Sequence, residues 1–104
     1  MKKSTQIAIN EAVISAMERY EKYAAENIGY DSVKPFRYCD AKVIKHGPFI
    51  LLQSFKTIVA IIDEDRRCFD FLRKVYGYTQ CSATQIAKFC RDYDAIIKYT
   101  YRKV

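Results

Sequence analysis

A helical pattern of apolar positions opens the chain. Apolar residues recur at the spacing of one face of an α-helix, at Ile9, Val13, Ala16, Tyr20 and Tyr23. Ser4 or Thr5 can cap the start of this helix, and Gly29 can close it in a left-handed conformation. The pattern predicts a helix over residues 5–28 that packs one face on the rest of the protein.

The middle of the chain changes to the patterns of β-strands. Residues 30–35 read as a loop, because Pro35 pushes the residue before it away from helical torsion angles. Branched and aromatic residues then predict three strands, at 36–45, 49–55 and 57–62. The last of these is continuously apolar, as in a strand covered on both faces. Residues 66–76 alternate imperfectly and fit either a strand or a helix.

Residues 78–90, YTQCSATQIAKFC, predict a second helix. Ser82 and Gln85 have the spacing of a capping box, and apolar residues at helical spacing follow, at Ile86, Phe89, Cys90 and Tyr93. The segment after Asp94 is β-branched and aromatic and predicts a final strand. The order α-β-β-β-β-α-β indicates an α+β fold, a mostly antiparallel sheet with two helices packed on one face. We expect a single domain over residues 1–104.

The basic charge is concentrated in the last part of the chain. Residues 1–65 hold nine Lys and Arg and nine Asp and Glu, whereas residues 66–104 hold nine Lys and Arg against three Asp. The whole net charge of +6 therefore falls in residues 66–104, which also hold eight of the 15 Phe and Tyr. A basic region with interleaved aromatic residues attracts polyanions, and its rings can stack on bases. A solvated basic face around an aromatic core fits the same pattern.

We therefore predict a surface in this region that binds nucleic acid or a host nucleic-acid-binding protein. The candidate residues are Arg66, Arg67, Arg73, Lys74, Lys88, Arg91, Lys98, Tyr99, Tyr101, Arg102 and Lys103. In the last strand, cations alternate with tyrosines, so both can reach a nucleic acid. The same alternation fits tyrosines in the core and cations in water. The oligomeric state is open.

The motifs of common enzyme classes are missing from the sequence. It contains no G-x-S-x-G, P-loop, G-x-G-x-x-G or H-E-x-x-H. The one histidine, His46, lies in a KHGP turn, where a surface or hydrogen-bonding role is commoner than a Cys–His pair. Asp63, Glu64 and Asp65 fit a solvated turn better than a cation site. We expect no catalysis, no metal and no cofactor.

The four cysteines, at positions 39, 68, 81 and 90, lack the short paired spacings of zinc sites. We expect buried thiols in a reducing compartment. A bond between Cys81 and Cys90 is excluded within one helix, where about 13 Å would separate them.

A cytoplasmic location is expected from the apolar runs of the chain. The longest candidate, TIVAII at 57–62, is far shorter than the ~20 residues of a membrane span. Asn10 and Glu11 interrupt the apolar region that a secretory signal would need.

A helix-turn-helix is disfavoured, although SATQIAKFC resembles the first helix of that motif. The segment that follows, RDYDAIIKYTYRKV, has no Gly and is β-branched, which is unlike a turn and a recognition helix.

Two segments, at 54–63 and 78–93, share positions with a known pattern. The positions that align with this pattern are Ser54, Phe55, Thr57, Val59, Ala60, Tyr78, Thr79, Cys81, Ser82, Ile86 and Phe89. They resemble a family of small uncharacterised proteins from phages and gut bacteria, with the motifs Ser-Tyr-x-Thr-x-Val-Ala and Tyr-Ser-x-Thr-Thr-x-x-His-Ile-x-x-Phe. Cys81 replaces a usual Thr and Gln85 the usual His, so a function that requires this His is absent here. The resemblance implies a phage or mobile-element setting and no particular reaction.

These features together predict a non-catalytic accessory binding protein that associates with nucleic acid through its C-terminal half. The alternative is a phage-encoded inhibitor of a host defence nuclease, similar in action to anti-CRISPR proteins. Such an inhibitor needs only a rigid fold and a contact surface rich in Tyr and Arg.

Overall fold

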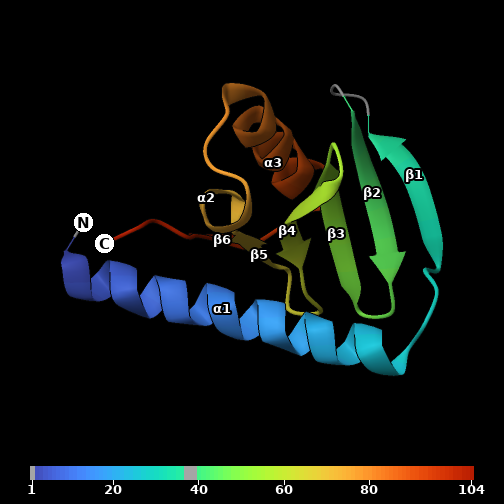
Figure 1. The fold of residues 1–104 in the computed structure, drawn as a ribbon, viewed down its shortest axis with the longest axis horizontal. Coiled ribbons are helices and arrows are strands. Elements are labelled where there is room, and N and C mark those ends of the chain that lie inside the picture. Colours follow the sequence, from blue (N-terminus) through green and yellow to red (C-terminus); the bar gives the residue numbers. More distant parts are fainter. Residues whose placement is uncertain (1, 37–39) are drawn as a thin grey trace.

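A six-stranded sheet between two helices forms the fold of this protein, in a computed structural model that describes residues 2–36 and 40–104 (Figure 1). Its elements are α1 (Lys3–Glu26), β1 (Ser32–Phe36), β2 (Ala41–His46), β3 (Phe49–Ser54), β4 (Thr57–Ile62), β5 (Arg67–Asp70), α2 (Leu72–Val75), α3 (Gln80–Asp92) and β6 (Ile97–Thr100). The α+β class and the order of helix, strands, helix and strand are confirmed. One strand and the short helix α2 are additions to the predicted order.

The strands lie in the sheet in the same order as in the sequence, from β1 to β6. The four pairs from β1 to β5 are antiparallel, with Val43 opposite Leu52. β6 is parallel to β5, and α2 and α3 form the crossover that a parallel pair requires. One further hydrogen bond, from the Tyr101 N–H to the Asp70 carbonyl, continues this pairing beyond β6.

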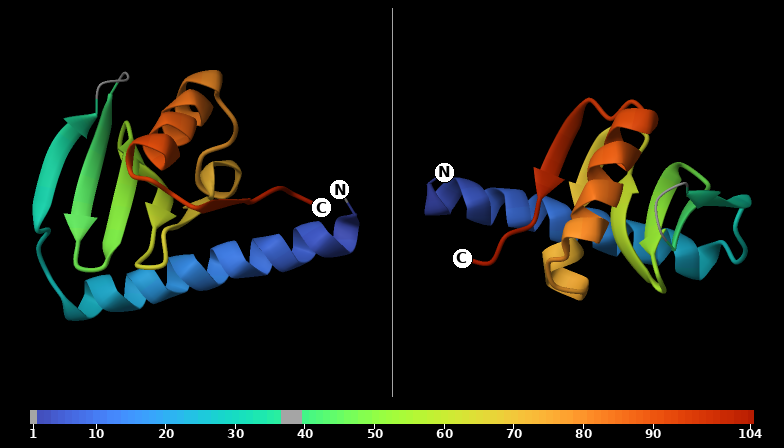
Figure 2. Two further views of the ribbon diagram at one scale, coloured as in Figure 1. Left: turned by 180° about the vertical axis from the view of Figure 1, so that it is seen from behind. Right: turned by 90° about the horizontal axis from the view of Figure 1, so that it is seen from above.

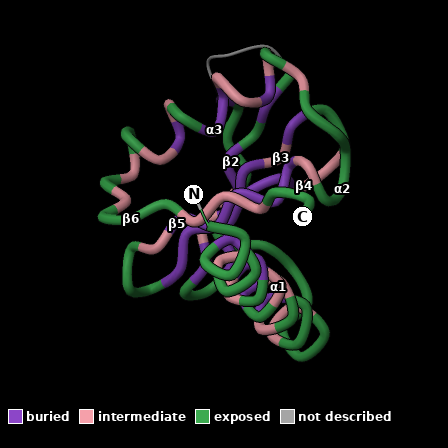
Figure 3. Tube along the Cα trace, turned by 90° about the vertical axis from the view of Figure 1, so that its left-hand side faces the viewer, coloured by how far each residue is buried: buried purple, intermediate pink, exposed green. Residues whose placement is uncertain are grey.

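The two main helices cover opposite faces of the sheet. Successive side chains of a strand point to opposite faces, and each face has its own core. Under α1 the core includes Val13, Ala16, Tyr20, Ile44, Leu51, Ile61 and Phe69. Under α3 it includes Val43, Leu52, Ile62, Cys68, Ile86 and Phe89. The prediction that both helices pack on one face was wrong, because the central strands are apolar in both directions and need cover on both sides (Figure 3).

Helix α1 differs from its prediction at both ends. It begins at Lys3 without a side-chain cap, so the expected cap by Ser4 or Thr5 was wrong. It ends at Glu26, two residues earlier than expected. Its buried stripe is partly polar and consists of Gln6, Asn10, Val13, Ala16 and Tyr20. The two amides have partners in the C-terminal segment, described below.

Two predicted boundaries in the sheet were also wrong. The segment 30–35, expected as a loop, contains most of β1, and the expected strand 36–45 is divided between the end of β1 and all of β2. Pro35 is tolerated because β1 is an edge strand, where a missing N–H costs no sheet hydrogen bond. Residues 66–76 contain both alternatives, a strand followed by the short helix α2.

The start of α3 is capped by a residue that the sequence interpretation passed over. Thr79 accepts a hydrogen bond from the Ser82 N–H at 3.1 Å, so the expected capping box of Ser82 and Gln85 was wrong. The Ser82 hydroxyl is instead buried, 2.9 Å from the hydroxyl of Ser54 in β3. Gln85 is buried within the helix, with its Nε2 3.7 Å from the sulfur of Cys81. The two segments that carry the family resemblance therefore pack against each other.

A disulfide joins β5 to α3. It links Cys68 to Cys90, with their Cα atoms 6.3 Å apart. The expectation of free thiols was wrong for this pair, although both residues do lie in the core under α3. Cys81 is not part of this disulfide, and Cys39 lies outside the described residues.

Candidate nucleic-acid interface

The end of β5, the start of α2 and the segment that follows β6 meet at one end of the sheet. Asp70 ends β5 opposite Thr100, the last residue of β6. Because α2 begins two residues after Asp70, its basic side chains come to lie beside the segment that follows β6. The Lys74 Nζ, for example, lies 5.4 Å from the centre of the Tyr101 ring. We call this surface the basic end and define it by Arg73, Lys74, Tyr78, Lys98, Tyr101 and Arg102.

A buried acid, Asp70, lies at the centre of the basic end. Only 5% of its surface is exposed, and its Oδ1 accepts the N–H of Leu72 at 3.1 Å. Burial raises the pKa of Asp70, and the Leu72 N–H and the charges of Lys98, Arg73 and Arg102 oppose this rise in part. The Lys98 Nζ lies 3.8 Å from Oδ2. One carboxylate is therefore shared among three cations, which leaves positive charge at the surface.

Aromatic rings accompany these cations. The Arg73 guanidinium lies 4.6 Å from the centre of the Tyr78 ring, a distance typical of cation–π stacking. Tyr99 stacks on Phe69 at 5.3 Å and packs into the core under α1. Tyr101 is partly buried against the same core. The rings therefore differ in exposure: Tyr78 is exposed, whereas Tyr99 and Tyr101 pack against the core under α1.

Two amides of α1 hold the C-terminal segment in place. Asn10 donates from Nδ2 to the Arg102 carbonyl at 2.7 Å and accepts the Arg102 N–H at Oδ1, at 3.0 Å. Gln6 donates from Nε2 to the Thr100 carbonyl at 3.0 Å and to Asn10 Oδ1 at 2.7 Å. The two amides thus make the backbone hydrogen bonds that a neighbouring strand would otherwise make, and they fix the backbone that carries Tyr101 and Arg102.

The start of α1 adds charge at the same end of the molecule. Both termini lie there in Figure 1 and in both views of Figure 2. Lys2 and Lys3 are exposed, and the first turn of α1 contains no acidic residue. The positive end of the helix dipole points the same way.

Other predicted candidates lie apart from the basic end. Arg66 and Arg67 are at the opposite end of β5, and Arg91 pairs with its neighbour Asp92 at 3.5 Å. Lys88 lies on α3. Lys103 is exposed and follows Arg102 directly, so it extends the basic end.

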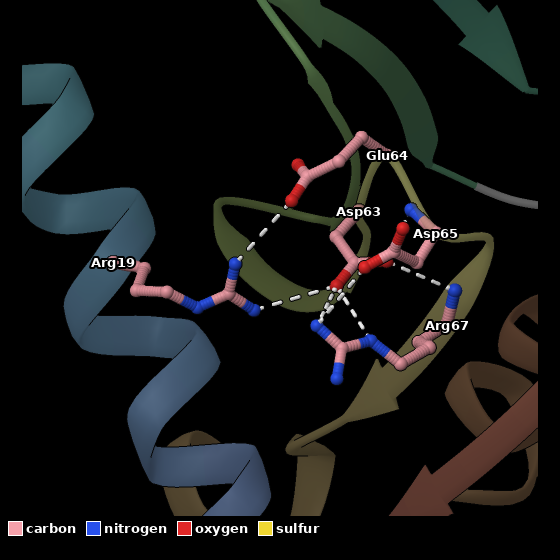
Figure 4. A network of polar contacts seen from close by, with 5 residues as sticks. All are labelled: Arg19, Asp63, Glu64, Asp65 and Arg67. Carbon is pink, nitrogen blue, oxygen red and sulfur yellow. Dashed lines mark hydrogen bonds and ion pairs between the residues drawn. The ribbon is translucent and has the colours of Figure 1, made fainter.

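Arg67 is neutralised by an acidic turn, shown in Figure 4. The Asp63 side chain is fully buried, and the Arg67 guanidinium donates to it at 2.7 and 2.9 Å. Asp63 Oδ1 also accepts hydrogen bonds from the N–H groups of Asp65 and Arg67. Arg19 of α1 approaches Asp63 Oδ2 at 3.4 Å. Burial alone would raise the pKa of Asp63, but the hydrogen bonds and charge of Arg67 and the Asp65 N–H outweigh it and hold the pKa below its usual value.

The acidic turn is therefore mainly a structural joint between α1 and the sheet. The expectation of a solvated turn was wrong for Asp63 and holds for Glu64 and Asp65, which are exposed. Asp63, Glu64 and Asp65 are close enough to hold a cation. The oxygens of Asp63 already accept hydrogen bonds from Arg67 and Asp65.

His46 has a structural position at the end of β2. It is buried, with Nε2 2.6 Å from the Asn27 carbonyl and Nδ1 2.9 Å from the Tyr20 hydroxyl. Because a carbonyl only accepts, Nε2 carries the hydrogen, and Nδ1 can accept the hydrogen of Tyr20. The expected hydrogen-bonding role is confirmed, and the ring ties β2 to α1.

Sequence reasoning missed two sets of residues at or beside the basic end. Tyr76 and Tyr78 follow α2 and are 49% and 52% exposed, but nothing in the local pattern separates an exposed tyrosine from a core one. Lys2 and Lys3 were not among the predicted binding residues. Their place beside the C-terminal segment depends on the hydrogen bonds of Gln6 and Asn10, which span almost the whole sequence.

Comparisons of the chain with protein-family models, curated proteins and solved structures find no match. Among the described residues, no helix has the length and apolar character needed to cross a membrane. The geometry and charge of the basic end are therefore what indicates a function for this protein.

Proposed function

We propose that the protein is a non-catalytic accessory protein that binds nucleic acid through the basic end. One observation carries the proposal: basic side chains from α2 and from the segment after β6 gather with aromatic rings around a single buried acid, Asp70. Cations in this arrangement neutralise phosphates and release their counterions. The family resemblance adds a phage or mobile-element setting to this proposal.

The expected strength of the salt dependence follows from the charges. Lys98 faces Asp70, which leaves Arg73, Lys74, Arg102 and Lys103 for phosphates. Four phosphate contacts give a slope of about −3 for log affinity against log salt concentration on a single strand. Affinity should then fall roughly 60-fold between about 50 and 200 mM salt.

The experiment measures binding to a fluorescent oligonucleotide at several salt concentrations. The double variant Arg73→Ala/Lys74→Ala should weaken binding and reduce the salt slope by about half. The matched control, Lys42→Ala/Lys45→Ala, removes the same charge from exposed sites on β2, which three strands separate from β6. The control should bind as the unaltered protein does.

Two results would overturn this proposal. One is an equal loss of affinity in both double variants, which would mean that only the net charge matters. The other is the absence of polynucleotide binding even at low salt. If a purified host nuclease instead binds the protein, and the complex survives digestion of nucleic acid, the inhibitor alternative replaces it.

A further inference from the structure

We infer that the basic end takes an unpaired strand, with a base stacked on Tyr78; this inference rests on the proposed function. It names the form of nucleic acid that the surface fits, which charge alone does not decide. Bases inside a duplex are already stacked on their neighbours and cannot lie on a protein ring, whereas unpaired bases can.

The ring of Tyr78 stands in an exposed segment between α2 and α3. Tyr76 and Tyr78 are 49% and 52% exposed. Gly77 separates the two tyrosines with φ of 90°, and a Cβ built on it would meet no atom within 4 Å. The segment therefore projects from the body of the protein, and its rings are open to a ligand.

Tyr78 is held in position before any ligand binds. The Arg73 guanidinium lies over its ring at 4.6 Å, and its hydroxyl donates to Gln80 Oε1 at 2.8 Å. One contact fixes the ring from its face, and the other fixes it from its tip. A ring held in this way loses little conformational freedom when a base stacks on it.

The surrounding cations fit the backbone of such a strand. Arg73 and Lys74 come from α2 beside the ring, and Lys74 reaches over Tyr101 toward the C-terminal segment. Arg102 and Lys103 continue this line of charge along the backbone that Asn10 fixes. A strand can thus place phosphates on both groups of cations while a base lies on Tyr78.

The test compares three probes of equal length: a single-stranded oligothymidylate, the same backbone without bases, and a duplex. The unaltered protein should bind the oligothymidylate at least about fivefold more tightly than the abasic strand, given the usual contribution of one stacked base. Tyr78→Ala should abolish that difference. Tyr78→Phe keeps the ring and should preserve it. Tyr30→Ala, at an equally exposed tyrosine (52%) beside His46, serves as the control and should also preserve it.

The outcomes separate this inference from the proposed function. If the three probes bind equally, or if Tyr78→Ala keeps the preference for bases, the inference fails while electrostatic binding stands. If none of the probes binds, both fail. Where the oligothymidylate does bind, an oligouridylate of the same length shows whether the preferred strand is RNA or DNA, since both offer unpaired bases. Thermal unfolding of each variant by circular dichroism shows that it is folded.

Discussion

Reduction of the Cys68–Cys90 disulfide should lower the stability of the protein by an amount that the sequence separation sets. The bond closes a loop of 22 residues between β5 and α3. In the chain-entropy model, closing a loop of this length in the unfolded state is worth about 3 kcal/mol at 25 °C. The free energy of unfolding of the oxidised protein should therefore exceed that of the reduced protein by about this amount.

The assay is urea denaturation, followed by far-UV circular dichroism, with and without a reductant. A background with Cys39→Ser and Cys81→Ser leaves only the pair that the structure joins. In this background the reductant should shift the unfolding midpoint, and adding Cys90→Ser should remove the effect. At a typical urea slope of about 1–3 kcal/mol per molar, the shift should be about 1–3 M.

Two results would refute the reasoning. A thiol titration of the oxidised, denatured double-serine protein that still finds both thiols would show that the bond does not form. A midpoint that ignores the reductant, in protein whose thiols are shown to be joined, would show that closure of the loop does not stabilise this fold.

Three further predictions concern the clamp that Asn10 forms on Arg102 through two hydrogen bonds, the turn at Gly47 and the side chain of Tyr20. Asn10→Leu removes both hydrogen bonds to Arg102 and should lower the free energy of unfolding by about 1–3 kcal/mol in urea denaturation; an unchanged midpoint would contradict the clamp. Gly47→Ala should cost about 2 kcal/mol in the same assay, because φ is 59° and the new Cβ would overlap the Tyr23 hydroxyl; full stability would contradict it. Burial, with the charges of Tyr30 and Tyr23, raises the pKa of Tyr20 to about 12. Since the unfolded value is near 10, this stabilisation is complete below about pH 10 and is lost as the pH rises toward 12. Urea midpoints across this range should fall less in Tyr20→Phe, and an equal fall in both proteins would contradict the assignment.

The sequence predicted the elements of this fold better than their arrangement. The strands 49–54 and 57–62 were found because each is an apolar run bounded by turn residues. β1 was missed because its Pro35 is a loop signal everywhere except at a sheet edge, and the edge is a property of the assembled sheet. The error about the helix faces has a similar origin, since apolar runs in β3 and β4 show that both faces are covered without showing by which helix.

The candidate site was predicted in part for the same reason. Arg73, Lys98 and Arg102 were named from the charge distribution, and the structure brings them together around Asp70. Arg67 was named on the same grounds, but a nearby acid from the preceding turn neutralises it. Charge counted along a chain does not show which cations have a carboxylate beside them in space. That pairing depends on the turn at 63–65, where the buried Asp63 accepts hydrogen bonds from the N–H groups of Asp65 and Arg67.

The clamp between Asn10 and Arg102 has a consequence for the order in which the protein assembles. These residues are 92 positions apart, so their contact closes one of the longest loops available to the chain. Long loops are entropically expensive to close and tend to form late in folding. The arginine and tyrosine that follow β6 should therefore settle after the sheet has formed, and local opening should release them first. Amide hydrogen exchange at residue 102 should then run faster than exchange in the central strands, and the proposed nucleic-acid binding should weaken at temperatures well below global unfolding.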